Sequence, residues 1–200
     1  MQIDSDLHNI FDATLVADGL GDAMVIFSEG EENRVIARRY SGGEWIAPAE
    51  LGSSVGKTMD AAYDSNHNII VLFVQKDNGI DRIFAARYTG GLTDKWMNAV
   101  AIDGGAGNSD YPGIVFDSND NGIVVYSEKV FSEELNYAAP RIFAIRYIAN
   151  TGWEKPVSID GRSTSSASVP QIVIDLNNQV MVLFARPDLD SGQIYSVQYK

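Results

Sequence analysis

The sequence predicts an all-β protein made of four similar units, and two repeated features support this prediction. One is a pair of apolar strands joined by a tight turn of Asp, Asn and Gly residues. It occurs four times, at residues 13–29, 59–75, 111–128 and 170–186. The other is a third strand that ends in tyrosine, at residues 34–40, 82–88, 141–147 and 193–199. No segment shows the 3.6-residue periodicity of an amphipathic helix, so we expect almost no helix.

A fourth strand follows in three of the units and completes the fold prediction. Each of these strands begins at a tryptophan after a Gly-bearing turn: Trp45, Trp96 and Trp153. Intervals of 46, 53 and 58 residues separate the turn aspartates Asp18, Asp64, Asp117 and Asp175. A period of roughly 40–50 residues with four antiparallel strands per unit is typical of a β-propeller blade. The sequence therefore predicts a four-bladed β-propeller.

The two chain ends are expected to form the missing strand of the last unit together. The fourth copy stops at Lys200, directly after its third strand, whereas the first residues, MQIDSD, match the ends of fourth strands at 100–105 and 157–162. We expect residues 2–4 to pair antiparallel with residues 194–198, because ring closure removes unpaired strand edges. The chain would then be one domain, residues 1–200, with blades at approximately 11–52, 57–104, 111–161 and 169–200 plus 1–5.

The composition excludes some classes of function. The formal net charge of −12, with a pI near 4.4, disfavours nucleic acid as a partner, because such binding depends on Lys and Arg. This charge suits a cationic partner or calcium, and it also fits a role in solubility alone. The chain has no cysteine, which excludes disulfides and thiolate metal sites. No apolar run approaches the ~20 residues that a membrane span needs, so no membrane insertion is expected.

The blades resemble those of bacterial secreted and cell-surface β-propeller repeat proteins. The resemblance rests on W-x-x-P, a Gly/Ser-rich connector, P-x-I-x-x-D-x-N-x-N-G and then R-I-x-A-x-R-Y, and it covers the whole chain. It implies an extracellular, cell-surface or periplasmic location, although the N-terminal residues lack the features of a secretory signal. In blade count the chain is similar to hemopexin-type propellers, but it lacks their disulfide. It also lacks the S-x-D-x-G-x-x-W box of sialidase-type blades.

One of the turns has the spacing of a calcium loop. Asp117, Asn119 and Asn121 place oxygens at positions 1, 3 and 5 of a D-x-N-x-N-G sequence. These residues are the candidate ligands for Ca²⁺, and no other cofactor is indicated. The glutamate that completes an EF-hand at position 12 is missing. The alternative is that Asp and Asn simply form the hairpin turn, since they bond to their own backbone and tolerate positive φ.

Charged residues face each other across the second and third strands of the blades. Arg34 lies opposite Glu29, and Arg141 lies opposite Glu128. The other two copies carry an Arg and a Gln at these positions. Cross-strand pairs of opposite charge contribute roughly 0.2–1 kcal/mol to stability. The alternative is a ring of polar groups that binds a ligand at the mouth of the propeller.

Two further sets of residues have both a structural and a functional interpretation. The three tryptophans either pack between the blades, as large aromatic residues do in cores, or stack on sugars. Thr14, Asp60, Gly113 and Gln171 share one register in the first strands, and three of them are polar in otherwise apolar strands. They either line a central channel or form structural hydrogen bonds.

The longest loop between second and third strands marks the predicted ligand site. It spans the twelve residues 129–140, whereas such loops usually have 2–5 residues. We expect it beside the connector before the third blade, so that aromatic rings and carboxylates converge on one rim, as a sugar or a cationic peptide segment requires. The predicted ligand-binding residues are Asp110, Tyr111, Glu128, Phe131, Glu134, Tyr137 and Arg141. The alternative is a tolerated surface insertion.

The sequence favours a non-catalytic binding or scaffold module that recognises a glycan or a protein through one loop face. Enzyme signals are weak, because His8 and His67 are the only histidines and no carboxylate pair stands out among 27 acidic residues. The alternatives are a glycan-active hydrolase and half of a larger propeller that a second chain completes. The expected partner is a carbohydrate or a protein, and the chain is expected to be a monomer or a homodimer.

Overall fold

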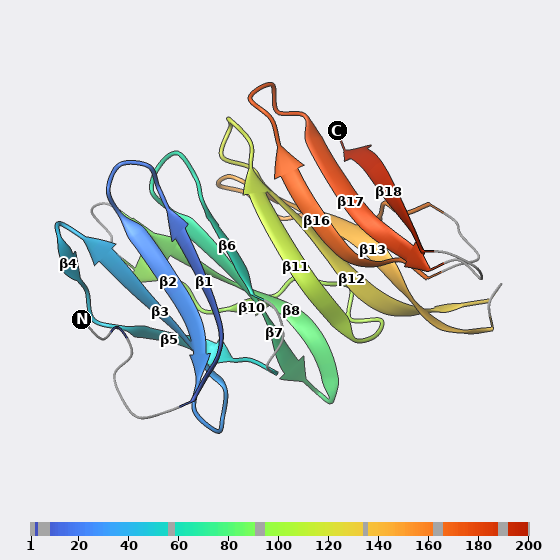
Figure 1. The fold of residues 1–200 in the computed structure, drawn as a ribbon, viewed down its shortest axis with the longest axis horizontal. Helices are drawn as coiled ribbons and strands as arrows, with labels where there is room; N and C mark the ends of the chain where they lie inside the picture. Colours follow the sequence, from blue (N-terminus) through green and yellow to red (C-terminus); the bar gives the residue numbers. More distant parts are fainter. Residues whose placement is uncertain are drawn as a thin grey trace.

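The computed structural model describes residues 3, 9–55, 59–90, 95–133, 136–161, 166–187 and 192–199. Within these residues every regular element is a β-strand, and the strands form four antiparallel sheets. The sheets stand side by side in chain order, with the first and the last at opposite ends of the long axis (Figure 1). The described part contains no helix that is long and apolar enough to cross a membrane. The prediction of four antiparallel β units is confirmed.

The first three sheets share one plan, in which three long strands run in order and a fourth is split into two short segments. The first sheet contains β1 (Ile10–Ala17), β2 (Ala23–Glu29), β3 (Arg34–Ser41), β4 (Glu44–Trp45) and β5 (Ala49–Ser53). The second contains β6 (Asp60–Tyr63), β7 (Ile69–Asp77), β8 (Ile80–Thr89), β9 (Lys95–Trp96) and β10 (Val100–Ala101). The third contains β11 (Ser109–Phe116), β12 (Gly122–Ser132), β13 (Tyr137–Ile148), β14 (Gly152–Trp153) and β15 (Val157–Ser158). The last contains β16 (Ser168–Ile174), β17 (Val180–Pro187) and β18 (Gly192–Tyr199).

The split in the fourth strand has a local cause in two of the sheets. Both segments of this strand pair with the third strand of their sheet. Pro48 and Pro156 fall between the segments, and proline has no backbone N–H to donate to the neighbouring strand. A hydrogen bond still crosses the break in the first sheet, where the N–H of Ile46 donates to the carbonyl of Arg39 at 2.8 Å. The outer strand therefore stays attached to its blade.

The hydrophobic core consists of three layers, one between each pair of neighbouring sheets. In the first layer, Met24 and Ile26 of β2 pack with Val71 and Phe73 of β7, and none of the four is more than 1% exposed. Because side chains alternate along a strand, each central sheet gives one set of residues to each of its neighbours. The core is therefore a stack of inter-sheet layers, as expected for a repeat protein.

Aromatic rings and guanidinium groups strengthen the contacts within and between sheets. In the first three sheets the third-strand tyrosine lies against the tryptophan of its own sheet, with ring centroids 5.2–5.3 Å apart. Trp96 and Trp153 also pack against the core layers, so the packing interpretation is confirmed for these two. An arginine of each of the first three sheets lies 5.2–5.4 Å from the ring centroid of the next sheet's tyrosine, in the pairs Arg39–Tyr88, Arg87–Tyr147 and Arg146–Tyr199. Such cation–π contacts contribute about 0.5–2 kcal/mol each.

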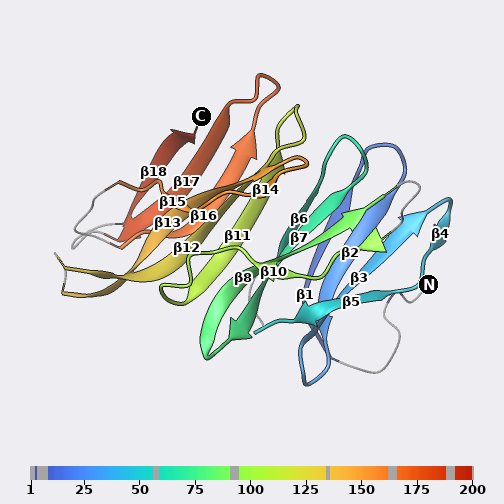
Figure 2. The same cartoon turned by 180° about the vertical axis from the view of Figure 1, so that it is seen from behind.

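The predicted ring closure is not found among the described residues. The last sheet has three strands in this part of the chain, and none of them pairs with the N-terminal segment. Gln2 and Asp4 lie outside the described residues, whereas the carbonyl of Ile3 accepts a hydrogen bond from Arg38 of β3. The guanidinium of Arg38 therefore attaches Ile3 to the first sheet, and Figure 2 shows this sheet and the sheet of β18 at opposite ends of the molecule. The four sheets form an open row.

Candidate functional site

A cavity of about 340 Å³ lies where the first strands of the last three sheets begin. Strands β6, β11 and β16 lie next to one another along one side of the molecule, and their first residues form its wall (Figure 1). Its surface is divided almost evenly between polar and apolar atoms. The polar side chains come from one residue of each strand: Asp60, Tyr111 and Gln171. A few convergent polar side chains among apolar residues are typical of small-molecule sites.

The backbone at the edge of this cavity is strained at two places. Tyr111 has a φ of 54° and Val169 a φ of 56°, a region that side-chain-bearing residues rarely adopt and that is an outlier for valine. Each of them precedes a proline and lies in a β-bulge, where strand register shifts between Asp110 and Gly113 and between Ser168 and Gln171. Bulges and strained backbone are enriched at functional sites, where they direct a side chain away from its regular position.

Asp60 connects two of the strands that form the cavity. Its Oδ2 accepts a hydrogen bond from the backbone N–H of Ile114 in β11 at 2.9 Å. Burial of the carboxyl raises the pKa of Asp60, and hydrogen bonds from Ile114 and Ala61 oppose this only in part. Gly113 keeps the neighbouring wall open, because a Cβ at this position would lie 3.2 Å from the Cγ2 of Ile172 and 3.8 Å from Asp60 Oδ2.

The shared register of the first strands identified part of this cavity from sequence. Asp60, Gly113 and Gln171, which occupy equivalent positions in β6, β11 and β16, all belong to its lining. Thr14, the fourth residue of that set, lies on β1 and is not among the lining residues. The positive φ values of Tyr111 and Val169 could not be predicted, because a residue before proline is expected to be extended.

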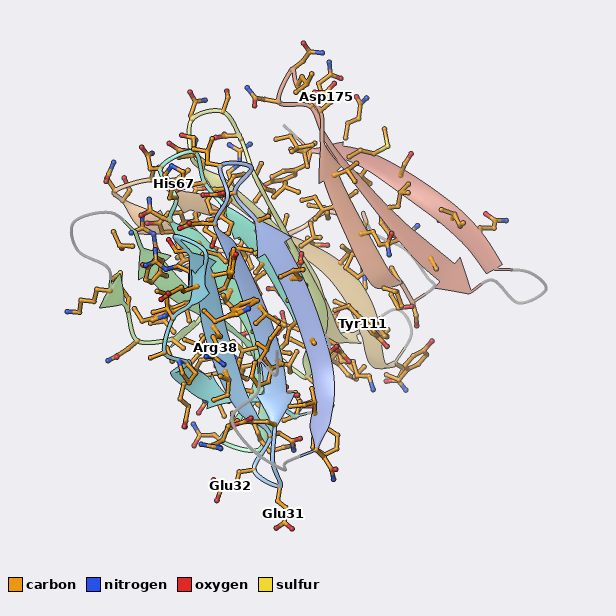
Figure 3. All side chains as sticks on the ribbon, turned by 60° about the vertical axis from the view of Figure 1, so that its left-hand side comes forward. Glu31, Glu32, Arg38, His67, Tyr111 and Asp175 are labelled. Carbon is orange, nitrogen blue, oxygen red and sulfur yellow. The ribbon has the colours of Figure 1, made fainter. Side chains whose placement is uncertain are left out.

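The exposed aromatic residues predicted for the ligand site are divided between two places. Tyr111 lies at the cavity, whereas Phe131 and Tyr137 lie at the tip of the hairpin formed by β12 and β13. Figure 3 shows Tyr111 away from the turn end of the sheets, where His67 and Asp175 lie. Asp110 pairs with Ser127 at the start of β11, and Glu134 lies outside the described residues.

The predicted pair of Glu128 and Arg141 is directed into the protein. The two residues are Cα partners across β12 and β13, as expected, but their charged groups bind elsewhere. Glu128 is 1% exposed and accepts the N–H groups of Ala106 and Gly107 at 2.7 and 3.3 Å, and burial raises its pKa. Arg141 donates to both carboxylate oxygens of Asp160 at 2.7 and 3.0 Å. The six described residues of the predicted ligand site are therefore divided between the cavity, the hairpin tip and the interior, and their role in binding stays a prediction.

Two buried aspartates that the sequence interpretation did not single out bind the third-strand arginines. Asp103 accepts the Nε–H of Arg82 at 2.5 Å, as Asp160 accepts that of Arg141. Both side chains are fully buried, and each is the aspartate of the repeated Ile-Asp-Gly sequence after the fourth strand. The repeat of this sequence could have identified the two aspartates. The cross-strand ion pair that we predicted exists in the first sheet, where Arg34 binds Glu29 at 2.9 Å.

The candidate calcium loop has the hydrogen bonds of an Asx turn. Oδ1 of Asp117 accepts the backbone N–H groups of Asn119 and Asn121, both at 2.9 Å, and Oδ2 accepts the side-chain amide of Asn121 at 3.0 Å. Asp64 and Asp175 bind their own turns in the same way. Among the described residues no group of three His, Cys, Asp or Glu residues could hold a metal ion. Calcium binding by Asp117, Asn119 and Asn121 stays a prediction.

No family model and no curated protein matches this chain, but solved structures do. A PL25 ulvan lyase bound to -[GlcA(1-4)Rha3S]- matches with a TM-score of 0.60 and 11% identity, over 94% of this chain and 55% of the lyase. The endo-arabinase from Bacteroides thetaiotaomicron matches with a TM-score of 0.51 and 12% identity, over 96% and 74%. A mutant of the Aleuria aurantia lectin in complex with α-methyl-L-fucoside matches with 0.51 and 15%, over 88% and 56%.

At these identities the comparisons show the fold alone. The chain has a β-propeller fold, with four blades that correspond to the four sheets. It spans little more than half the length of the ulvan lyase and of the lectin. The matched proteins are therefore considerably longer than this open row of blades.

Proposed function

We propose that this chain is a non-catalytic glycan-binding module and that the sugar occupies the cavity between β6, β11 and β16. The observation that carries the proposal is the convergence of Asp60, Tyr111 and Gln171 in a cavity whose other lining residues have no polar side chain. A carboxylate and an amide can bond to sugar hydroxyls, while an aromatic ring can cover the apolar C–H face of a sugar. The volume of about 340 Å³ is at the lower end of the range for ligand sites and suits a short saccharide.

The solved structures that resemble the chain support this class of ligand. They are a polysaccharide lyase with a bound saccharide, an endo-arabinase and a lectin with a bound fucoside. The net charge of −12 and the carboxyl group of Asp60 disfavour a polyanionic glycan, since like charges repel. A neutral glycan is therefore the proposed ligand.

The described cavity lining has one carboxyl group, which favours binding over hydrolysis. Glycosidases generally use two carboxyl groups on either side of the bond, roughly 5–9.5 Å apart. In the described part of the chain Asp60 is the one carboxylic acid of the cavity lining. Its raised pKa fits a proton donor, but a second carboxylate to act as nucleophile or base is not present in this lining. A glycan-active hydrolase remains the second candidate.

A panel of neutral oligosaccharides, screened on an array and then by calorimetry, tests the proposal. Tyr111→Ala and Gln171→Ala should each weaken binding about tenfold, because one lost hydrogen bond or stacking contact is worth roughly 1–1.5 kcal/mol. Asp60→Asn should weaken binding less, since the amide keeps one acceptor. The thermal midpoints of Tyr111→Ala and Gln171→Ala should stay close to that of the wild type, because Tyr111 and Gln171 are exposed.

The hairpin of β12 and β13 provides the matched control. Phe131→Ala and Tyr137→Ala remove exposed aromatic rings outside the cavity and should leave the affinity unchanged. If Tyr137→Ala abolishes binding and Gln171→Ala does not, the site is on the hairpin rim. If no saccharide binds to the wild type, the glycan proposal is wrong and a protein-binding or scaffold role takes its place. Release of reducing sugar from a bound polysaccharide would favour the hydrolase.

A further inference from the structure

The outer face of the last sheet has the residue pattern of an inter-blade contact, but no blade of the described chain lies against it. In the third sheet, Ile123, Val125 and Ile142 contact the last sheet and are at most 3% exposed. Strand pairing places Met181, Leu183 and Ile194 at the equivalent positions of the last sheet. They are 41, 40 and 81% exposed, respectively. In each earlier sheet, the face at these positions packs against the next sheet. The last sheet therefore has the same apolar face, but exposed.

The first sheet is open on its opposite face, along β1. Leu15 pairs with Val25 as Ile114 pairs with Val124 in the third sheet, so Leu15 and Ile114 are equivalent. Ile114 is 5% exposed and belongs to the core layer that faces the preceding sheet, whereas Leu15 is 66% exposed. The two ends of the row are thus complementary, because one end lacks a following blade and the other lacks a preceding blade.

The hairpin turns repeat this asymmetry. At the two contacts among the last three turns, a serine of one turn binds a polar side chain of the next: the N–H of Ser65 donates to Asp120 at 2.8 Å, and that of Ser118 to Asn178 at 2.9 Å. The equivalent position in the last turn is Leu176, which is fully exposed. The turn of the first sheet carries Leu20, 79% exposed, while its Asp18 binds His67 of the second turn at 2.7 Å. The last turn therefore presents leucine where the second and third turns use a polar contact to the next turn.

The accessible surface is larger than that of a closed protein of this size. It amounts to 10975 Å². The surface expected for a compact monomer of 21.8 kDa is about 9300 Å². The excess of roughly 1700 Å² is comparable to the 1200–2000 Å² that a stable protein interface buries.

We propose that a second copy of this chain completes the propeller by head-to-tail docking. The outer face of the last sheet, with Met181, Leu183 and Ile194, packs on the face of the partner that presents Leu15. The partner's last sheet packs on the first sheet of this copy in the same way. Two equal contacts then close one ring, because a heterologous contact forms a ring when the rotation closes. A second copy fits better than an unrelated protein, since it supplies both missing blade contacts at once.

Sedimentation velocity and light scattering on the whole chain, at a series of concentrations and at two salt concentrations, test this proposal. We expect the mass to be twice 21.8 kDa, with the dimer favoured by salt, which screens the repulsion between two chains of charge −12. Leu183→Glu and Leu15→Glu should each give a monomer, because each places a charge in both contacts of the ring. Val157→Glu is the matched control, since Val157 is as exposed as Leu183 but lies on the outer strand β15.

Mixing the two monomeric variants tests the head-to-tail geometry. The Leu15→Glu chain keeps an intact last sheet and the Leu183→Glu chain keeps an intact first sheet, so the mixture should form a dimer with one wild-type contact. A wild-type monomer at all concentrations would overturn the proposal and leave these faces to further blades of a longer chain. Dimers that Leu15→Glu does not disrupt would show tail-to-tail packing instead. Assemblies larger than two copies would contradict ring closure.

Discussion

At the scale of single residues, Asp60 should make the free energy of unfolding fall as the pH rises. Burial raises its pKa in the folded protein above the value in the unfolded chain. The folded state then holds the proton more tightly, so the stabilisation is complete below the unfolded pKa and is lost as the pH rises through the folded pKa. Asp60→Asn stays neutral throughout. Urea unfolding of both proteins across the acid range should therefore show the variant gaining stability relative to the wild type with increasing pH.

One outcome of the pH series would contradict this prediction, and Asp175 provides a control. A constant difference between the wild type and Asp60→Asn would mean that the carboxyl titrates alike in the folded and unfolded states. Asp175 offers the opposite sign, because hydrogen bonds from the backbone of Gln179 and Asn177 lower its pKa despite some desolvation. Its contribution is present above the unfolded pKa and is lost as the pH falls through the folded pKa.

Residue-level prediction from sequence succeeded where a side chain broke a local pattern. Asp60 and Gln171 were found because they are polar at one register position of apolar strands, and both line the cavity. Glu128 looked like a surface residue of a hairpin, yet it is buried because the connector of Ala106 and Gly107 folds over its carboxylate. Such long-range contacts leave no signal in strand periodicity.

At the scale of elements, the Asp/Asn turns should depend on their aspartates and not on calcium. Asp117→Ala removes the acceptor of two backbone N–H groups and one amide, so unfolding should become easier by about 1–3 kcal/mol. The thermal midpoint of the wild type should be the same with millimolar calcium and with chelator, because both oxygens of Asp117 already accept hydrogen bonds. Differential scanning calorimetry of the wild type and the variant measures both effects.

A control in the same turn separates the two interpretations. Asn119 contributes its backbone N–H to Asp117, which Asn119→Ala retains, so this variant should lose little stability. A midpoint that rises with calcium in the wild type, and not in Asn119→Ala, would show that Asn119 and Asp117 are metal ligands. The turn interpretation would then be incomplete.

The strands themselves were the most predictable elements, because period-2 apolar patterns and turn residues determine them locally. The hairpins β7–β8 and β12–β13 have the register that facing residues implied, including the pairing of Glu128 with Arg141. The split of the fourth strand was less visible, since it depends on how Pro48 and Pro156 sit against the third strand. The cavity could be predicted only in part, because it requires three strands that are distant in sequence to meet.

At the scale of the whole molecule, the open row differs from the closed ring that the sequence suggested. The sequence MQIDSD does resemble the ends of the fourth strands. It could not reveal how far the first sheet lies from the last, because the rotation from blade to blade depends on the core layers between them. In the structure this rotation leaves the two outermost sheets at opposite ends (Figure 1). Apolar residues such as Leu183 and Leu15 are consequently exposed.

Amide hydrogen exchange should reveal a gradient of stability along this row. In β7 the residues Ile69–Val74 are at most 1% exposed, because sheets cover both faces, whereas most residues of β18 are exposed. Each blade is stabilised mainly by its neighbours, so opening should begin at the ends, and amides of β7 and β12 should exchange most slowly. If a second copy docks, protection of β17 and β1 should rise with concentration, and Leu183→Glu should remove that rise. Uniform protection across the four sheets would mean that the row unfolds as one unit, and the blade-by-blade account of its stability would be wrong.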